Sequence, residues 1–199
     1  MHISEGVLSP AVLAAGVILS AAGVAMGLKK MSADRMPEVA VLSSAFFIVS
    51  LIHIPVGPAS VHLIMNGLVG VLLGWMAFPS ILVALTLQAL VFQYGGFTVL
   101  GVNTFTVAAP AVTAYYLFSC AIKRNDNSSL TALAAFCAGA LGVGLAALLL
   151  VLALVTTGEV FINVAKLIAI AHLPVFIIEG AITAFCVLFL KKVKPELLN

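Results

Sequence analysis

Long apolar runs separated by short polar stretches dominate the chain. A helix needs about 20 apolar residues to cross a bilayer, and the runs reach or approach that length. They are continuously apolar, without the alternation of apolar and polar residues that is typical of membrane-spanning strands. The pattern therefore predicts helical spans at 8–28, 38–54, 61–78, 80–94, 103–122, 129–156 and 172–190.

Two parts of this pattern differ from the rest. The third and fourth spans are short and meet at the sequence Phe78-Pro79-Ser80, so we expect them to be tilted or partly sheltered. The sequence of residues 158–172, which leads into the last span, predicts a helix on the outer membrane surface.

Nothing in the sequence indicates a second domain, an internal repeat or a low-complexity tract. We expect residues 1–199 to form a single transmembrane helical domain. Its parts are an N-terminal segment at 1–7, the bundle at 8–190 and a cytoplasmic tail at 191–199.

The composition agrees with a membrane location. Hydrophobic residues make up 63% of the chain and charged residues 8%, against about 25% charged residues in soluble domains. We therefore predict an all-α integral membrane protein with about seven transmembrane helices in a single bundle. The net charge of +2 gives no reason to expect a nucleic-acid partner.

Basic residues predict the orientation. Most of them fall in three groups, which follow spans one, five and seven: Lys29, Lys30 and Arg35; Lys123 and Arg124; and Lys191, Lys192 and Lys194. By the positive-inside rule that side is cytoplasmic, so the N-terminus is expected outside and the C-terminus in the cytoplasm. No basic residue precedes the first apolar run, unlike in a signal peptide, so Met1 is expected to remain at the mature end.

The histidines are distributed asymmetrically. All four of them, His2, His53, His62 and His172, fall at the predicted outer ends of the spans. A single histidine is usually an ordinary hydrogen-bonding group. Four on one side, one of them next to the terminus, favour a metal site that opens to the exterior.

The first two residues form a chelating unit. The terminal amine of Met1, the amide nitrogen of His2 and the imidazole of His2 can close around one cation in fused five- and six-membered rings. These three nitrogens lie nearly in a plane. A fourth nitrogen would complete a square-planar set, which is diagnostic of Ni(II) or Cu(II).

The fourth nitrogen is predicted to come from His62. Pro55, Gly57 and Pro58 interrupt the helical pattern before it, so the chain can turn back into the protein there. Asn66 lies four residues later, on the same face if the segment is helical, and is expected to line the pocket. His53 is the competing donor, whereas His172 is expected at the membrane interface.

Other polar residues are expected around this pocket. Glu5 is either a carboxylate at a helix start or a tether for the N-terminal segment. Gln93 and Asn103 flank an outer loop, and polar groups at that depth line a cavity or bond to other helices. Gly95 and Gly96, in the same loop, would let the backbone approach a ligand closely.

Three sequence stretches carry a resemblance to a known family. "MHISEG", "GPASVH" and "FQYGGFTVLGVNTF" resemble the substrate-binding membrane (S) component of cobalt/nickel energy-coupling-factor (ECF) transporters, the CbiM/NikM family. The resemblance covers the whole chain. It implies that Met1, His2 and His62 hold the metal. Many cobalt-type relatives have "SCSHPTG" around the later histidine, where this chain has "PASVHLIMNG".

The resemblance also implies a function and partners. The protein would bind Ni²⁺ or Co²⁺ as transported substrate, without an organic cofactor, and deliver it for ATP-driven uptake across the cell membrane of a prokaryote. Its partners would be a transmembrane coupling (T) protein, a pair of cytoplasmic ATPase subunits and a small accessory membrane subunit. The chain lacks a GxxxxGK[ST] loop, so ATP hydrolysis is expected on the partner chains.

Two other classes compete with this interpretation. A stand-alone secondary metal-ion transporter or channel would need acidic groups near the membrane midplane, and Glu179 is the one such residue within a predicted span. An intramembrane metalloenzyme would need a motif such as HExxH, which is absent. We therefore expect no enzymatic activity.

Overall fold

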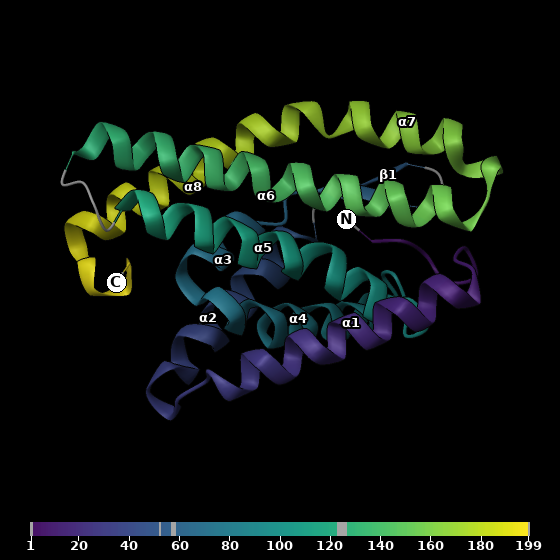
Figure 1. Cartoon of the computed structure of the whole chain (residues 1–199), viewed down its shortest axis with the longest axis horizontal. Coiled ribbons are helices and arrows are strands. Elements are labelled where there is room, and N and C mark those ends of the chain that lie inside the picture. The colour runs from purple at the N-terminus through teal and green to yellow at the C-terminus, as the bar shows by residue number, and fades with distance from the viewer. Residues whose placement is uncertain (1, 52, 57–58, 123–126, 199) are drawn as a thin grey trace.

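A computed structural model describes residues 2–51, 53–56, 59–122 and 127–198. Figure 1 shows long helices that run side by side. The α-helices are α1 (Pro10–Lys29), α2 (Met36–Val49), α3 (Asn66–Leu73), α4 (Ala77–Phe92), α5 (Leu100–Ile122), α6 (Ser128–Thr157), α7 (Ile162–Ala171) and α8 (Leu173–Val193). The remaining elements are strands β1 (His53–Val56) and β2 (Ala59–His62) and the 3₁₀ turns η1 (Ala33–Arg35), η2 (Gly74–Met76), η3 (Glu159–Phe161) and η4 (Pro195–Leu198).

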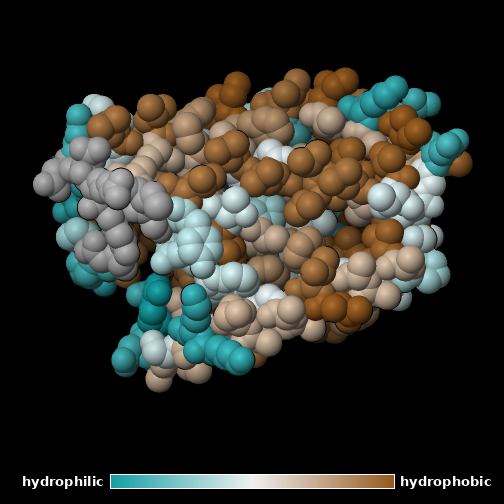
Figure 2. Space-filling model, viewed as in Figure 1, coloured by the Kyte–Doolittle hydropathy of each residue, from teal (hydrophilic) through white to brown (hydrophobic). Residues whose placement is uncertain are grey.

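Helix α5 lies at the centre of the bundle. It packs against α1, α3, α4 and α6, while α8 packs along α6. Figure 1 shows α5 between α1 and α6 in this view. Large hydrophobic side chains are exposed on the outer faces of the helices, among them Ile18, Leu148 and Phe185. Figure 2 shows hydrophobic residues across the middle of the visible face and hydrophilic residues towards its ends, as expected for a bundle surrounded by lipid.

Small residues bring helix backbones close together. A Cβ at Gly23 of α1 would lie 2.3 Å from the Phe78 ring, and a Cβ at Gly139 of α6 would lie 2.6 Å from the carbonyl oxygen of Glu179. Gly23 of α1 and Gly139 of α6 therefore serve helix packing inside this chain.

The spans differ in part from the prediction. Four helical segments of the described residues are long and apolar enough to cross a membrane: Pro10–Lys29, Asn66–Phe92, Ser128–Thr157 and Leu173–Val193. The predicted break at 78–80 is wrong, because those residues lie inside α4 and the interruption is the 3₁₀ turn Gly74–Met76. The expected helix within 158–172 is confirmed by α7, and α8 includes the first three residues of the expected tail.

A β-hairpin is the main departure from the all-α prediction. The predicted second span ends at Val49 instead of residue 54, and the first residues of the predicted third span belong to β2. Strands β1 and β2 pair antiparallel, with His53 opposite His62. β-branched Ile and Val side chains alternate with other residues here, which favours a strand.

Candidate metal centre

The N-terminal segment adds a third chain to the hairpin. Ile3 forms a β-bridge with Ala59, and the amide of Ser60 donates to the carbonyl oxygen of His2 over 3.2 Å. Ile3 is completely buried and His2 is 5% exposed. Residues 2 and 3 are therefore folded into the protein.

Asn103 of α5 holds this segment in place. Its Oδ1 accepts a hydrogen bond from the Ile3 amide at 2.9 Å, and its Nδ2 donates to the Ile3 carbonyl oxygen at 3.1 Å. One buried side chain thus satisfies both backbone groups of Ile3. Two hydrogen bonds to the backbone of one residue, one on each side of its Cα, fix its position and orientation.

Glu5 tethers the segment to the loop between α4 and α5. Its amide donates to the carbonyl oxygen of Gly95 over 3.1 Å, and its Oε1 accepts from the amide of Thr98 at 3.0 Å. The helix-start alternative for Glu5 is wrong, because α1 begins only at Pro10. A Cβ at Gly96, where φ is +121°, would lie 2.1 Å from the Glu5 side chain, so glycine is required for this close approach.

His2 and His62 meet at the centre of this arrangement. Nδ1 of His2 lies 2.9 Å from Nε2 of His62, and the two rings stack with centroids 4.7 Å apart and planes 26° apart. Nδ1 of His62 lies 2.8 Å from the carbonyl oxygen of Leu63. Because a carbonyl only accepts, this bond assigns the proton of a neutral His62 to Nδ1 and leaves a lone pair on Nε2, to which His2 donates.

The environment keeps His62 neutral. Burial lowers the pKa of His62 from 6.5 to about 4, the bond to the Leu63 carbonyl raises it in part, and the charge of His172 lowers it further. A neutral imidazole is the form that binds a metal ion. His62 therefore needs no deprotonation at neutral pH.

His172 differs from its predicted interfacial position. It is fully buried at the junction of α7 and α8, where its Nδ1 donates to the carbonyl oxygen of Ile168 at 2.7 Å. Burial lowers the pKa of His172. Its electrostatic effect on His62 places it in the surroundings of the pair, a proximity that the separation in sequence could not reveal.

The other predicted site residues are placed as follows. Met1 lies outside the described residues. His53 is opposite His62 in the hairpin, and its side chain is outside what the structure describes. Gln93 is exposed just after α4 with φ +57°, and its place at the pocket stays a prediction.

Asn66 also differs from the prediction. Its Nδ2 donates to the carbonyl oxygens of Val107 and Gly142, at 3.3 and 3.0 Å. The argument from a shared helix face with His62 is wrong, because β2 is a strand and α3 begins only at Asn66.

Sequence reasoning missed one contact next to His62. Oε1 of Glu179, in α8, accepts hydrogen bonds from the amides of Ile64 and Met65, at 2.5 and 2.8 Å. The sequence shows Glu179 as an acidic residue within a predicted span, but no local signal pairs it with residues more than a hundred positions earlier.

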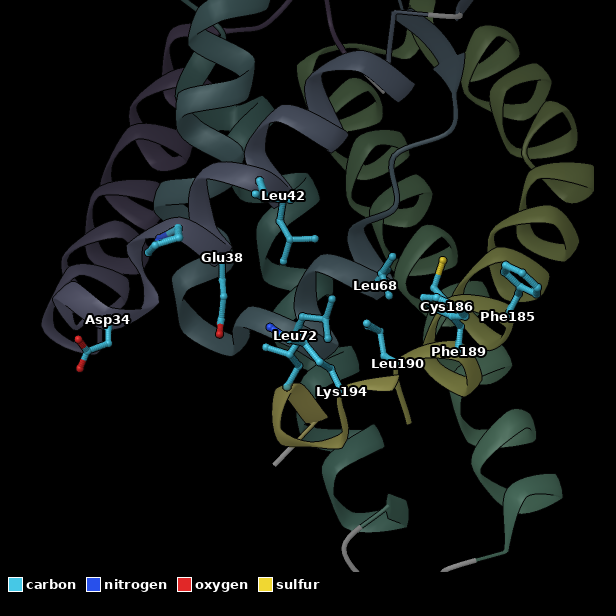
Figure 3. A pocket seen from close by; sticks show the side chains of 13 residues that line it. Asp34, Glu38, Leu42, Leu68, Leu72, Phe185, Cys186, Phe189, Leu190 and Lys194 are labelled. Atoms are coloured by element: carbon cyan, nitrogen blue, oxygen red, sulfur yellow. The ribbon is translucent and has the colours of Figure 1, made fainter. Parts of the chain in front are cut away.

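The hydrogen-bonded region just described is here called the hairpin end: residues 2–5, β1, β2 and the loop 93–99. The opposite ends of α2, α3 and α8 surround a groove of about 620 Å³, here called the groove end. Figure 3 shows Leu42 of α2 and Phe189 and Leu190 of α8 on either side of it, with Asp34 and Lys194 at its rim. No predicted site residue lines this groove.

The described side chains alone do not form a complete metal site. Within residues 2–51, 53–56, 59–122 and 127–198, no three His, Cys, Asp or Glu side chains gather closely enough to hold a metal ion. Any site at the His2–His62 pair therefore needs further donors from the backbone or from side chains outside those described, which include His53 and Met1.

Comparison with known proteins places the chain among metal transporters. A sequence model of the family described as "Cobalt uptake substrate-specific transmembrane region" matches residues 2–197. A putative metal transport protein of Haemophilus influenzae is 42% identical over 200 residues, which cover 100% of this chain and 97% of that protein. The cobalt transport protein CbiM of Sorangium cellulosum is 33% identical, covering 100% and 95%.

A fused relative and a solved structure are also similar. The putative fused nickel transport protein NikMN of Archaeoglobus fulgidus is 29% identical, over 100% of this chain and 68% of that protein. The crystal structure of a truncated transition metal transporter superposes with a TM-score of 0.83 at 28% identity, covering 97% of this chain and 99% of the other.

Proposed function

Because this chain belongs to the cobalt uptake substrate-specific transmembrane region family and is a multi-pass membrane protein, we propose that it binds one Ni²⁺ or Co²⁺ ion at the hairpin end for uptake into the cell. The proposed donors are the terminal amine of Met1, the amide nitrogen and Nδ1 of His2, and Nε2 of His62. Three of these nitrogens belong to the first two residues, and the fourth belongs to His62 at the end of β2, the strand to which residues 2 and 3 are hydrogen-bonded.

The distance between the two imidazoles is the observation that carries this proposal. Metal–imidazole bonds of about 2.0–2.1 Å put two nitrogens at a right angle about 2.8–3.0 Å apart. Nδ1 of His2 and Nε2 of His62 are 2.9 Å apart. The ion would replace the proton that the two rings share, and the rings would keep almost the same separation.

The chemistry of the chain terminus supplies the rest of the plane. In a chelate by residues one and two, Nδ1 of His2 closes a six-membered ring with its own amide, and the amine closes a five-membered ring. The amide nitrogen therefore lies between the amine and Nδ1, and the fourth position of the plane, which lies next to Nδ1, is left for Nε2 of His62. Four planar nitrogens suit Ni(II) geometry, and the hydrogen bond from His62 to Leu63 fixes the tautomer that the ligand requires.

The proposed mechanism depends on partner proteins. The chain has no phosphate-binding loop, so ATP hydrolysis by a pair of cytoplasmic ATPases would act through a transmembrane coupling protein, with a small accessory subunit. The three basic groups support an outer hairpin end and a cytoplasmic groove end. Rearrangement of the bundle would then open the site to the cytoplasm.

A stand-alone secondary transporter or channel is the alternative function. The buried Glu179 within α8 is the observation in its favour, although one of its oxygens already accepts two backbone hydrogen bonds. Nickel uptake by vesicles that contain this chain alone would support the alternative, whereas uptake that requires all partners supports the proposed one.

Metal titration of the purified chain tests the site. Protein with Met1 as its first residue is titrated with NiCl₂ and CoCl₂ in detergent, and the d–d absorption of planar nickel is recorded. We expect equimolar binding by the wild type and by Gln93→Ala, an exposed control. Binding should be lost in His2→Ala and in a variant with residues added before Met1; undiminished affinity in both would refute the proposed donor set.

A further inference from the structure

The short connection between β2 and α3 determines where His62 lies. Residues 63–65 follow His62 directly and belong to neither element. The Leu63 carbonyl accepts the hydrogen bond that orients the His62 ring. Met65 adopts a left-handed conformation, with φ at +46°, which costs energy for a residue other than glycine. Surrounding contacts must therefore hold this turn in place.

Glu179 provides such a contact. It is fully buried, and its Oε1 accepts from the amides of both Ile64 and Met65. These amides precede the first turn of α3, where backbone N–H groups have no partner within the helix. A carboxyl oxygen from another helix thus accepts from the amides of the N-cap residue Met65 and of the residue before it, as the carboxylate of a capping box accepts from the N-cap amide.

The helix that carries Glu179 is itself held firmly. A Cβ at Gly139 of α6 would lie 2.6 Å from the Glu179 carbonyl oxygen, and a Cβ at Gly180 would lie 2.8 Å from the Phe136 ring. The backbones of α6 and α8 therefore approach closely at this level. The packing of these two helices determines where the Glu179 side chain lies. Through its hydrogen bonds to Ile64 and Met65, the side chain in turn determines where the turn after His62 lies.

We infer that Glu179 is a positioning residue, which holds His62 against His2 through the backbone of residues 63–65 and so slows release of the bound metal ion. This inference rests on the proposed function of the His2–His62 pair. It also links the site to α8: a shift of α8 along α6 would withdraw the carboxyl oxygen, free the turn at Met65 and move His62 away from His2.

Substitution at position 179 tests the inference. Glu179→Leu removes the acceptor with little change in size, whereas Glu179→Gln keeps an acceptor oxygen of the same reach. Thr183→Val is the matched control, because Thr183 lies one helical turn later on α8, is equally buried, and its hydroxyl has no hydrogen-bond partner among the described residues.

Nickel release to excess chelator is the main measurement, with the d–d spectrum of the loaded protein beside it. Loss of groups that orient metal ligands costs about 10- to 100-fold, so we expect Glu179→Leu to release nickel faster by about that factor, with the spectrum shifted towards that of His62→Ala. Glu179→Gln should lie closer to the wild type than to Glu179→Leu. Thr183→Val should match the wild type.

The outcomes separate this inference from the proposed function. If wild-type protein shows no His2-dependent nickel binding, the proposed function fails. If the wild type binds nickel, and a folded Glu179→Leu variant has the wild-type spectrum and release rate with only a lower thermal stability, Glu179 is merely structural. Should Glu179→Leu not fold, Glu179→Asp takes its place: the shorter carboxylate should release nickel faster, and an unchanged rate overturns the inference.

Discussion

The hairpin end and the groove end lie at opposite ends of the same helices but are built differently. At the hairpin end, hydrogen bonds join His2 to His62 and Ile3 to Asn103, and both histidines are buried. At the groove end, apolar side chains of α2, α3 and α8 leave an open space of about 620 Å³ (Figure 3). No histidine is among the residues that line this groove, so its lining lacks the imidazole nitrogens that suit nickel, and its volume alone does not make it a metal site.

The two ends are also ordered by different forces. Packing of apolar side chains is non-directional, and it tolerates space at the groove end. Hydrogen bonds at the hairpin end are directional, and they set the separation of two nitrogen atoms to within the range that a metal requires. Substitutions at the hairpin end are therefore expected to change metal binding much more than substitutions at the groove end.

The largest effect is expected at His62. His62→Ala removes the donor that closes the plane, so nickel affinity should fall by more than about 100-fold, the upper range for residues that only orient ligands. Isothermal titration with NiCl₂ measures this. His53→Ala is the comparison, since His53 is opposite His62 in the hairpin; a greater loss in His53→Ala than in His62→Ala would exchange their proposed roles.

The second effect is on stability and pH. The pKa of His62 is about 4 in the folded protein and near 6.5 when unfolded. Between these values the unfolded chain binds the additional proton, so the free energy of unfolding decreases as pH falls from 6.5 towards 4. The difference corresponds to on the order of 3 kcal/mol.

Metal-free protein is the appropriate sample for this measurement. Equilibrium unfolding in detergent should show a steeper loss of stability over that pH window in the wild type than in His62→Gln. His2, which bonds to His62, and His172, whose charge lowers the His62 pKa, remain in both proteins. Equal slopes in the two proteins would mean that His62 titrates normally, and that the hairpin end does not exclude water from it.

The third effect concerns the amide that holds the N-terminal segment. Asn103→Leu leaves the buried amide and carbonyl of Ile3 without their side-chain partner, so we expect nickel affinity to fall by about 10- to 100-fold. Asn66→Leu is the control, because Asn66 is equally buried but bonds to Val107 and Gly142 instead. A similar loss of affinity in both variants would indicate general destabilisation instead of a role for Asn103 at the site.

Some of the site was predictable from the sequence. His2 at the second position and the interruption before His62 predicted that the terminus turns back to meet a later histidine. The structure places these two side chains together, while Met1 stays outside the described residues. Gly95 and Gly96 are predicted to let the backbone approach a ligand closely; in the structure a Cβ at Gly96 would meet Glu5, and one at Gly95 would meet Asn103 and His2.

The hairpin and its long-range contacts were not predictable. The apolar residues on either side of the interruption at 55–58 read as the ends of helical spans, and a short buried strand cannot be told from a helix segment by periodicity alone. The strand forms because Ile3 and the amide of Ser60 pair the hairpin with the chain terminus. The contact of Glu179 with Ile64 depends on how α8 packs on α6, which no local pattern records.

The smallest effect is expected at the groove end, and it tests whether the two ends are independent in the isolated chain. Phe189 lines the groove on α8, is 56% exposed and lies ten positions after Glu179. Exposed positions usually change stability by less than about 0.5 kcal/mol, so Phe189→Ala should alter nickel affinity by no more than about twofold. The same titration as for His62→Ala measures it. A fall comparable to that of Asn103→Leu would mean that α8 carries a disturbance from one end to the other without any partner protein, and the hairpin end could then no longer be regarded as set by its own hydrogen bonds.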